Sequence, residues 1–513
     1  MARYKNTDNS QGLFLAVNLK EQLQPGTFEW TLDHLIEKTD ISIFEKSYKN
    51  DKNGACAYSP KILLKAIMYC YSLGIISSRR IEQACKNNIV IKALTANNEP
   101  DHDTIATFIS RDSVAVKDLF AQVLLQCAEL KLITGEMFAI DGCKLPSNAS
   151  KEWSGSIAEL KKKRDKLEKY IEKLLGLHRE LDKDASVQRK LNSYKKTMGD
   201  SKERHERSVQ RLEKKLKRLN EFLEKAEPRK GISGEEVKSN ITDNESAFIK
   251  SPHGYIQGYN GIAIADSGNQ IIVSAEAIGS GAESGSFPQM LDNLEENMKK
   301  VTGKEEPLKK SLVQGDTGFF TEDNLQEATK RKVNVLIPDQ QFRQRDPHFE
   351  DRKGKTKQKF GKEDFKYDKK NNCYICPSGK ILNHKGRAKL RNNEGEKYQA
   401  ATGSCVNCPL KEKCIKTQKP AKNIKRTLYI ADMKYKENLS DKMRKKIDEP
   451  VNRELYSRRM QIIEPVFSNI TYCKGMDKFT LQTQEKVNIQ WLLFCIVHNM
   501  SKCTAPLMRR IKK

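Results

Sequence analysis

The amino-acid sequence predicts an α/β fold in which one mixed sheet carries flanking helices, with an all-α domain before it and two insertions inside it. The first 135 residues carry apolar side chains at helical spacing. Between residues 241 and 340, strand-like segments in series are followed by alternating helical and strand-like segments, which is typical of an α/β layer. Two highly charged stretches, 153–240 and 341–450, interrupt this order.

The N-terminal region, residues 1–135, is predicted to be a helical domain that binds DNA. A Ser-Pro pair begins one helical run, a serine begins the next, and a longer run follows an Asn-Glu-Pro break. Short basic helices joined by tight turns would place Arg79 and Arg80 on DNA, although the same arginines also suit a solvated basic face.

The predicted core comprises residues 136–152 and 241–340. Its first part holds the compact apolar strand EMFAIDG. The second part contains two strand-like runs around an Asp-Ser-Gly-Asn turn, which predicts an antiparallel hairpin. A helix, a strand, a second helix and a second strand are expected to follow, so the sheet should be mixed.

The two insertions differ in character. Residues 153–240 carry leucines at helical intervals in two stretches, which predicts an antiparallel helical hairpin of the coiled-coil type with the polar stretch 182–199 between or beside its helices. The pattern leaves open whether this arm serves dimerisation or DNA contact. Residues 341–450 are basic and bear cysteines, and residues 451–513 are expected to return to the core as its final helices.

Three acidic residues indicate the chemistry. Asp141 and Asp316 each end a predicted strand, and Glu464 lies in a helical context. Burying the charge of a carboxylate at the end of a strand costs free energy unless a cation lies beside it. If the two strands are neighbours and a helix supplies the third acid, the group suits Mg²⁺ or Mn²⁺ engaged on a phosphodiester. Each acid taken alone also fits an ordinary turn or helix start.

The charge balance predicts a polyanionic partner. The chain has 93 Lys and Arg against 67 Asp and Glu, a net charge of +26. Nucleic acid is the first candidate and an anionic membrane surface the second. The N-terminus lacks the apolar core of a signal peptide, and the longest apolar run, Trp491 to Val497, is too short to cross a bilayer. A cytoplasmic protein without a membrane partner is therefore expected.

Five of the 13 cysteines are close together in the sequence. They are Cys373, Cys376, Cys405, Cys408 and Cys414. Two short Cys-x-x-Cys pairs have the spacing that thiolates need around tetrahedral Zn²⁺, and a site with four protein ligands would be structural. Five thiols compete for four places, and reduced, unligated thiols are the alternative.

Several motifs in order along the chain carry a family resemblance. They are YSPKILLKAIMYCYSLGIISSRRIE, NNEPDHDTIATF, FAIDGCKLPSNAS, GYNGIAIAD, QGDTGFF and RRMQIIEPVFSNI. Together they resemble bacterial insertion-sequence transposases of the DDE class, whose catalytic core is ribonuclease H-like. The resemblance runs from about Leu32 to Lys502 and leaves out the two insertions.

The resemblance implies a Mg²⁺-dependent enzyme that cleaves the ends of its own insertion sequence and joins them to target DNA. Asp141, Asp316 and Glu464 would be its catalytic, metal-binding residues. Its partners would be the terminal inverted repeats and the target DNA, held by a homodimer in the active complex. The family also repeats the CPxG…CxxC…C pattern, which favours Cys376, Cys405, Cys408 and Cys414 as the zinc ligands and leaves Cys373 spare.

Related transposases carry a Tyr-Arg-Glu-Lys signature in which the arginine and the lysine hold DNA phosphates. Tyr456 and Arg459 match its first two positions. The acid lies one residue further from Arg459 than the strict spacing, and Thr471 occupies the usual lysine position, so Lys474 is the substitute DNA contact.

Two other functions fit the same residues. One is a nuclease with the same core that hydrolyses nucleic acid without strand transfer, since water and a 3′ hydroxyl are interchangeable nucleophiles at such a site. The other is an inactive transposase that acts as a basic, DNA-binding coiled-coil protein.

Overall fold

The computed structural model describes most of the 513 residues, in the ranges 18–48, 56–181, 202–231, 234–251, 254–346, 360–390, 393–415, 424–431 and 439–511. The chain divides into two compact units, each described by itself below. The first comprises Met1–Arg229, Val237–Ile337 and Glu454–Lys513, and the second comprises Lys230–Glu236 and Pro338–Arg453.

The N-terminal region is helical, as predicted. Its helices are α1 (Phe28–Glu37), α2 (Ser42–Glu45), α3 (Pro60–Ser72), α4 (Ser78–Asn87), α5 (Ile89–Leu94), α6 (His102–Arg111) and α7 (Ser113–Glu129). The side chains of Thr27, Asp101 and Asp112 accept hydrogen bonds from first-turn N–H groups of α1, α6 and α7. Pro60 occupies the first turn of α3, where its missing N–H costs nothing.

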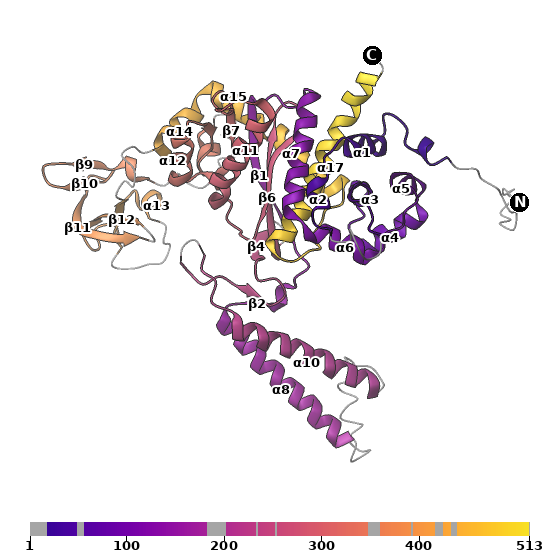
Figure 1. Cartoon of the computed structure of the whole chain (residues 1–513). Helices are drawn as coiled ribbons and strands as arrows, with labels where there is room; N and C mark the ends of the chain where they lie inside the picture. Colours follow the sequence, from indigo (N-terminus) through magenta and orange to yellow (C-terminus); the bar gives the residue numbers. More distant parts are fainter. Residues whose placement is uncertain are drawn as a thin grey trace, which may run out of the picture. The chain divides into compact units, whose positions relative to one another are not determined.

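The first unit contains the predicted mixed sheet (Figure 1). Its strands are β1 (Met137–Pro146), β4 (Ala247–Ser251), β5 (Gly254–Asp266), β6 (Ile272–Ile278), β7 (Leu312–Gln314) and β8 (Asn334–Leu336). The order is β4-β5-β1-β7-β8, with β6 also pairing with β5. Strand β5 runs antiparallel to β1, β4 and β6, whereas β1, β7 and β8 are parallel. The predicted hairpin is therefore confirmed as β5 and β6.

Helices before and after the sheet strands complete this unit. They are α11 (Phe287–Thr302), α12 (Glu322–Lys330), α16 (Arg459–Ser468) and α17 (Gln484–Ile511), with a short π-helical turn at Asn469–Cys473. Helix α17 contacts β6 as well as α1, α3, α6 and α7. It therefore joins the sheet to the N-terminal helices. All helices among the residues that the structure describes are too short or too polar to cross a membrane.

Side-chain amides and an indole connect α17 to the sheet. Trp491 Nε1 donates to Ile262 O on β5 at 3.0 Å. Asn499 bonds both backbone groups of Ile272 on β6, each at 2.8 Å. These bonds satisfy sheet backbone groups and fix the position of α17 on the sheet.

The first insertion contains two long helices that lie side by side (Figure 1). They are α8 (Ile157–Leu181) and α10 (Lys202–Lys225). Leu160, Leu174 and Leu219 are buried, as the predicted seam requires, whereas the adjacent Leu175 is exposed. The connection between the helices falls in residues 182–201, outside the described residues. At the base, β2 (Ser154–Gly155) pairs with β3 (Ser239–Asn240).

The second unit is built on a small antiparallel sheet of order β13-β12-β11-β10-β9. The strands are β9 (Lys366–Asp368), β10 (Cys373–Ile375), β11 (Ile381–Leu390), β12 (Asn393–Ala400) and β13 (Thr427–Ala431), and the helices are α13 (Lys411–Cys414), α14 (Leu439–Asp448) and the first residues of α15 (Pro450–Ser457). Phe365, Leu382, Tyr398 and Leu428 form its core together with Cys405 and Cys414.

Candidate functional site

The register of two parallel strands brings Asp141 and Asp316 together. The last residue pair between β1 and β7 is Ala139 with Gln314. Each acid lies two residues beyond its member of that pair. Alternate residues of a strand share one face, and equal offsets on parallel strands keep the two positions abreast. The two carboxylates therefore project from neighbouring positions at one edge of the sheet.

The expectation that Asp141 ends its strand is wrong. Strand β1 continues to Pro146 because β5 pairs with it along its whole second half, with Asp141 opposite Ala263. The pairing that ends at Ala139 is the one with β7. Asp141 thus lies where β1 keeps its antiparallel neighbour and has lost its parallel one, which opens one side of the strand to a ligand.

A third carboxylate, Glu283, lies at the same place. Ligand oxygens of Asp141, Glu283 and Asp316 are all within 4.8 Å of one another. Glu283 precedes the short 3-10 turn that leads into α11. Its sequence context offers little signal, since an acid before a helix is usually explained by the helix dipole.

Arg459 holds Asp141 from the first turn of α16. Its Nη1 lies 3.1 Å from Asp141 Oδ2, and both side chains are mostly buried. The backbone N–H of Gly142 donates to the other oxygen, Oδ1, at 2.9 Å. Tyr456 is hydrogen-bonded to Arg459, and burial raises the pKa of its phenol. The Tyr-Arg pair of the predicted signature therefore lies against the first acid.

Positively charged groups stabilise Asp316 and Glu283 less than Arg459 stabilises Asp141. Asp316 accepts a hydrogen bond from the N–H of Gly318 at 2.9 Å. Glu283 Oε1 accepts from Asn260 Nδ2 at 2.9 Å and lies 3.8 Å from Lys144 Nζ. Only 11% of the Glu283 side chain is exposed, so little water compensates its charge.

Burial raises the pKa of both Asp316 and Glu283 above the usual carboxyl range. For Asp316 the charge of Asp141 adds to this effect, and Arg459 opposes it. For Glu283 the hydrogen bond from Asn260 opposes the shift, and the charges of the two aspartates add to it. The folded protein therefore binds these protons more tightly than the unfolded chain, so ionisation of the pair at neutral pH costs stability.

The site fits a hard divalent cation. Three carboxylates provide only oxygen ligands, the kind that Mg²⁺ and Mn²⁺ prefer. Two glycines leave room among them: a Cβ at Gly142 would lie 3.0 Å from Glu283 Oε1, and a Cβ at Gly318 would lie 3.0 Å from Asp316 Oδ1 and 3.3 Å from Glu283 Oε2. The donor atoms and the space between them are therefore both suited to a metal ion.

Glu464 lies outside this group of carboxylates. It is an exposed residue of α16, whereas its neighbours Ile463 and Val466 are buried. Its membership of the metal-binding triad stays a prediction of the family resemblance.

The predicted DNA contacts differ in exposure. Arg79 and Arg80 are exposed in the first turn of α4. Lys474 is only 6% exposed, and its Nζ donates to Ser501 Oγ of α17 at 3.1 Å. Burial also lowers its pKa. The side chain of Lys474 therefore points into the protein, and its contact with a DNA phosphate stays a prediction.

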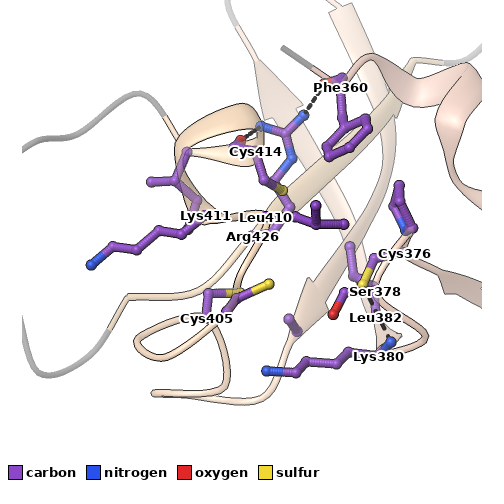
Figure 2. A pocket seen from close by; sticks show the side chains of 14 residues that line it. Phe360, Cys376, Ser378, Lys380, Leu382, Cys405, Leu410, Lys411, Cys414 and Arg426 are labelled. Atoms are coloured by element: carbon purple, nitrogen blue, oxygen red, sulfur yellow. Dashed lines mark hydrogen bonds between the residues drawn. The ribbon is translucent and has the colours of Figure 1, made fainter. Parts of the chain in front are cut away.

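Four cysteines of the second unit line a cavity of about 20 Å³. They are Cys376, Cys405, Cys408 and Cys414, the set that the family pattern favours, and Cys373 does not line it. Figure 2 shows Cys376, Cys405 and Cys414 on different sides of this cavity. The backbone N–H of Lys380 donates to Cys376 Sγ at 3.2 Å. Among the described residues, no three of these sulfurs come within 4.8 Å of one another, as the carboxylate oxygens do.

Two family models match the chain. One is described as a transposase DDE domain and matches residues 375–504; the other is described as a transposase domain (DUF772) and matches residues 17–111. The first range includes the four cysteines that line the cavity, Arg459 and Glu464, and the second includes Arg79 and Arg80. A comparison with curated proteins gives no match.

Proposed function

We propose that this chain, a transposase with a DDE domain, cuts the ends of its own insertion sequence and joins them to target DNA at the site of Asp141 and Asp316. Enzymes of this class cleave DNA and transfer the cleaved strand. The observation that carries this proposal is the meeting of the two acids on adjacent parallel strands, with a third carboxylate beside them. Such a group suits metal-dependent phosphoryl transfer.

The order of the strands supports a ribonuclease H-like core. Strand β5 pairs antiparallel with β1 and with β6, and β7 and β8 add in parallel on the other side of β1. Helices α11 and α12 precede β7 and β8. This is the arrangement that the family resemblance implies, with residues 136–152 and 241–340 as the first parts of the core and residues 451–513 as its last.

The DDE domain implies a divalent metal, and Asp141 and Asp316 would hold it. Bound ions of this kind activate the attacking water or hydroxyl and stabilise the departing 3′ oxygen. Arg459 orients Asp141 by binding one oxygen while the Gly142 N–H binds the other. Glu464 would act as the third acid of the triad, as the resemblance implies.

The remaining regions would bind and pair the DNA ends. We propose that residues 1–135 contact DNA through the exposed Arg79 and Arg80, since each neutralised phosphate adds affinity that does not depend on sequence. Pairing two element ends requires at least a dimer during the reaction. The arm of α8 and α10 would serve this pairing or DNA contact.

A strand-transfer assay tests the function. The substrate is a duplex that ends in the inverted repeats flanking the coding region, with a free 3′ hydroxyl, and the target is a supercoiled plasmid. With full-length protein and Mg²⁺ we expect plasmid covalently joined to the duplex. Nicked plasmid without joined product would instead identify the nuclease alternative, and DNA binding without any cleavage would identify the inactive one.

A structural Zn²⁺ is proposed for the second unit. Cys376, Cys405, Cys408 and Cys414 surround one cavity, and the core of this unit includes Cys405 and Cys414, with Cys376 packed against it. A tetrahedral ion among the four would join the β10–β11 turn to α13. Burial raises the pKa of Cys414 because it disfavours the charged thiolate, and a bound cation would stabilise that thiolate.

Replacing Cys405 with serine is expected to remove the zinc, because three thiolates hold the ion much more weakly than four. The measurement is zinc content per chain after gel filtration, with thermal unfolding recorded in parallel. Cys373→Ser is the matched control, since Cys373 is buried nearby but does not line the cavity. Equal zinc in both variants, or none in the unaltered protein, would contradict the proposal.

A further inference from the structure

The surrounding residues fix the position of the Glu283 carboxylate. Its two oxygens lie close to the glycines that follow the two aspartates: Oε1 would be 3.0 Å from a Cβ at Gly142, and Oε2 would be 3.3 Å from a Cβ at Gly318. The carboxylate therefore lies between the segments that carry Asp141 and Asp316.

Asn324 fixes the turn of Glu283 to the turn of Asp316. This residue of α12 is 3% exposed. Its Nδ2 donates to Ser284 O at 2.9 Å and to Phe319 O at 3.0 Å. Ser284 directly follows Glu283, and Phe319 is the last residue of the 3-10 turn that Asp316 caps. One buried amide thus holds both acid-bearing turns in a single arrangement.

Asn260 supplies an independent sign of a ligand. It is fully buried on β5, and its Nδ2 donates to Glu283 Oε1. Its carbonyl oxygen Oδ1 is buried and accepts no hydrogen bond from any residue that the structure describes. That oxygen lies beside Gly142, 2.7 Å from where a Cβ would stand. A buried acceptor without a donor is costly, and it lies next to the group of three acids.

The chemistry of these groups calls for a cation. Three carboxylates and one amide carbonyl present only acceptor oxygens, while the nearby cations are Arg459 on Asp141 and Lys144 at 3.8 Å from Glu283. A hydrated divalent ion supplies both the missing positive charge and water protons for the unsatisfied oxygen.

We infer that Glu283 is a further metal-binding carboxylate of this centre, positioned by Asn260, whose carbonyl oxygen accepts a hydrogen bond from a water on the ion. This inference rests on the proposed function, because it concerns the same metal centre. It makes Glu283 a ligand in addition to the acids that the family resemblance identifies, and it makes Asn260 a positioning residue.

The test measures Mn²⁺ binding to the full-length protein by electron paramagnetic resonance, together with DNA strand cleavage. Glu283→Gln is expected to weaken Mn²⁺ binding by more than about tenfold and to lower cleavage in parallel, and Asn260→Ala is expected to weaken binding by about tenfold. Thermal unfolding verifies that each variant folds, and Glu283→Asp is expected to recover part of the affinity.

Glu276→Gln is the matched control. Glu276 is also a largely buried acid whose pKa burial raises, and it is also bound by amide side chains, those of Gln289 and Asn293. It lies outside the group of three acids. Loss of Mn²⁺ affinity in Glu464→Gln alone, with Glu283→Gln behaving like Glu276→Gln, overturns the inference and leaves the proposed function standing. Full activity of Asp141→Asn and Asp316→Asn overturns the proposed function itself.

Discussion

Replacing Asp316 with asparagine is expected to lower DNA cleavage and strand joining by at least about 10³-fold while DNA binding is kept. The substitution keeps the size of the side chain and an oxygen that accepts from the Gly318 N–H, but it removes the charge that would hold the metal. Loss of several kcal/mol of transition-state stabilisation corresponds to a rate decrease of about this size. Single-turnover cleavage of an end-labelled duplex measures the rate, and a mobility shift measures binding.

Asp323→Asn is the control for this substitution, since Asp323 is an exposed acid in the first turn of α12, seven residues beyond. It should leave the rate unchanged. Cleavage by Asp316→Asn at the rate of the unaltered enzyme would remove Asp316 from the active site.

The two aspartate variants should also differ in stability. Because burial and the charge of Asp141 raise the pKa of Asp316, the contribution of Asp316 to folding stability falls as the pH rises from the ordinary carboxyl pKa through the raised one. Asp316→Asn removes this cost and should raise the midpoint of thermal unfolding at neutral pH. Asp141→Asn should lower it, because Arg459 loses its charged partner. A lower unfolding midpoint in both variants would mean that the charge of Asp316 does not destabilise the folded protein.

Replacing Trp491 with alanine is expected to cost about 3–5 kcal/mol of unfolding free energy. The indole is fully buried, and ring carbons would lie about 3.0 Å from a Cβ at Gly261, so the ring rests directly on β5. Its removal leaves a cavity and also deprives Ile262 O of a donor. Urea denaturation followed by circular dichroism measures the loss.

Leu73→Ala is the comparison for Trp491→Ala. The Leu73 side chain is half exposed, so its truncation should change the unfolding free energy by less than about 0.5 kcal/mol. A Trp491 variant that loses no more than this would show that α17 contributes little to the stability of the sheet.

Much of the core could be predicted because local patterns and packing agree. The hairpin of β5 and β6 follows from alternation around a turn, and the alternation of helices and strands up to β8 implies parallel neighbours. That order is what places Asp141 and Asp316 on adjacent strands. The cysteine set that the family pattern favours also lines one cavity.

Other features could not be read from the sequence because they depend on contacts distant along the chain. Strand β1 extends past Asp141 only because β5 pairs with it. Glu283 comes from a glycine- and serine-rich turn with no strand or helix period, and only the tertiary fold brings it to the aspartates. Lys474 directly follows a π-helical turn and bonds Ser501 from a buried position, which no spacing rule anticipates.

The attachment of α17 to β5 and β6 has a consequence during protein synthesis. The ribosome makes residues 137–336, with every strand of the sheet, well before residues 484–511 leave the exit tunnel. Until then Ile262 O and the backbone of Ile272 lack their partners on Trp491 and Asn499, and Arg459 arrives late at Asp141. In a growing chain, the carboxylates around Asp141 and the strands β5 and β6 therefore lack these contacts until α16 and α17 have been made.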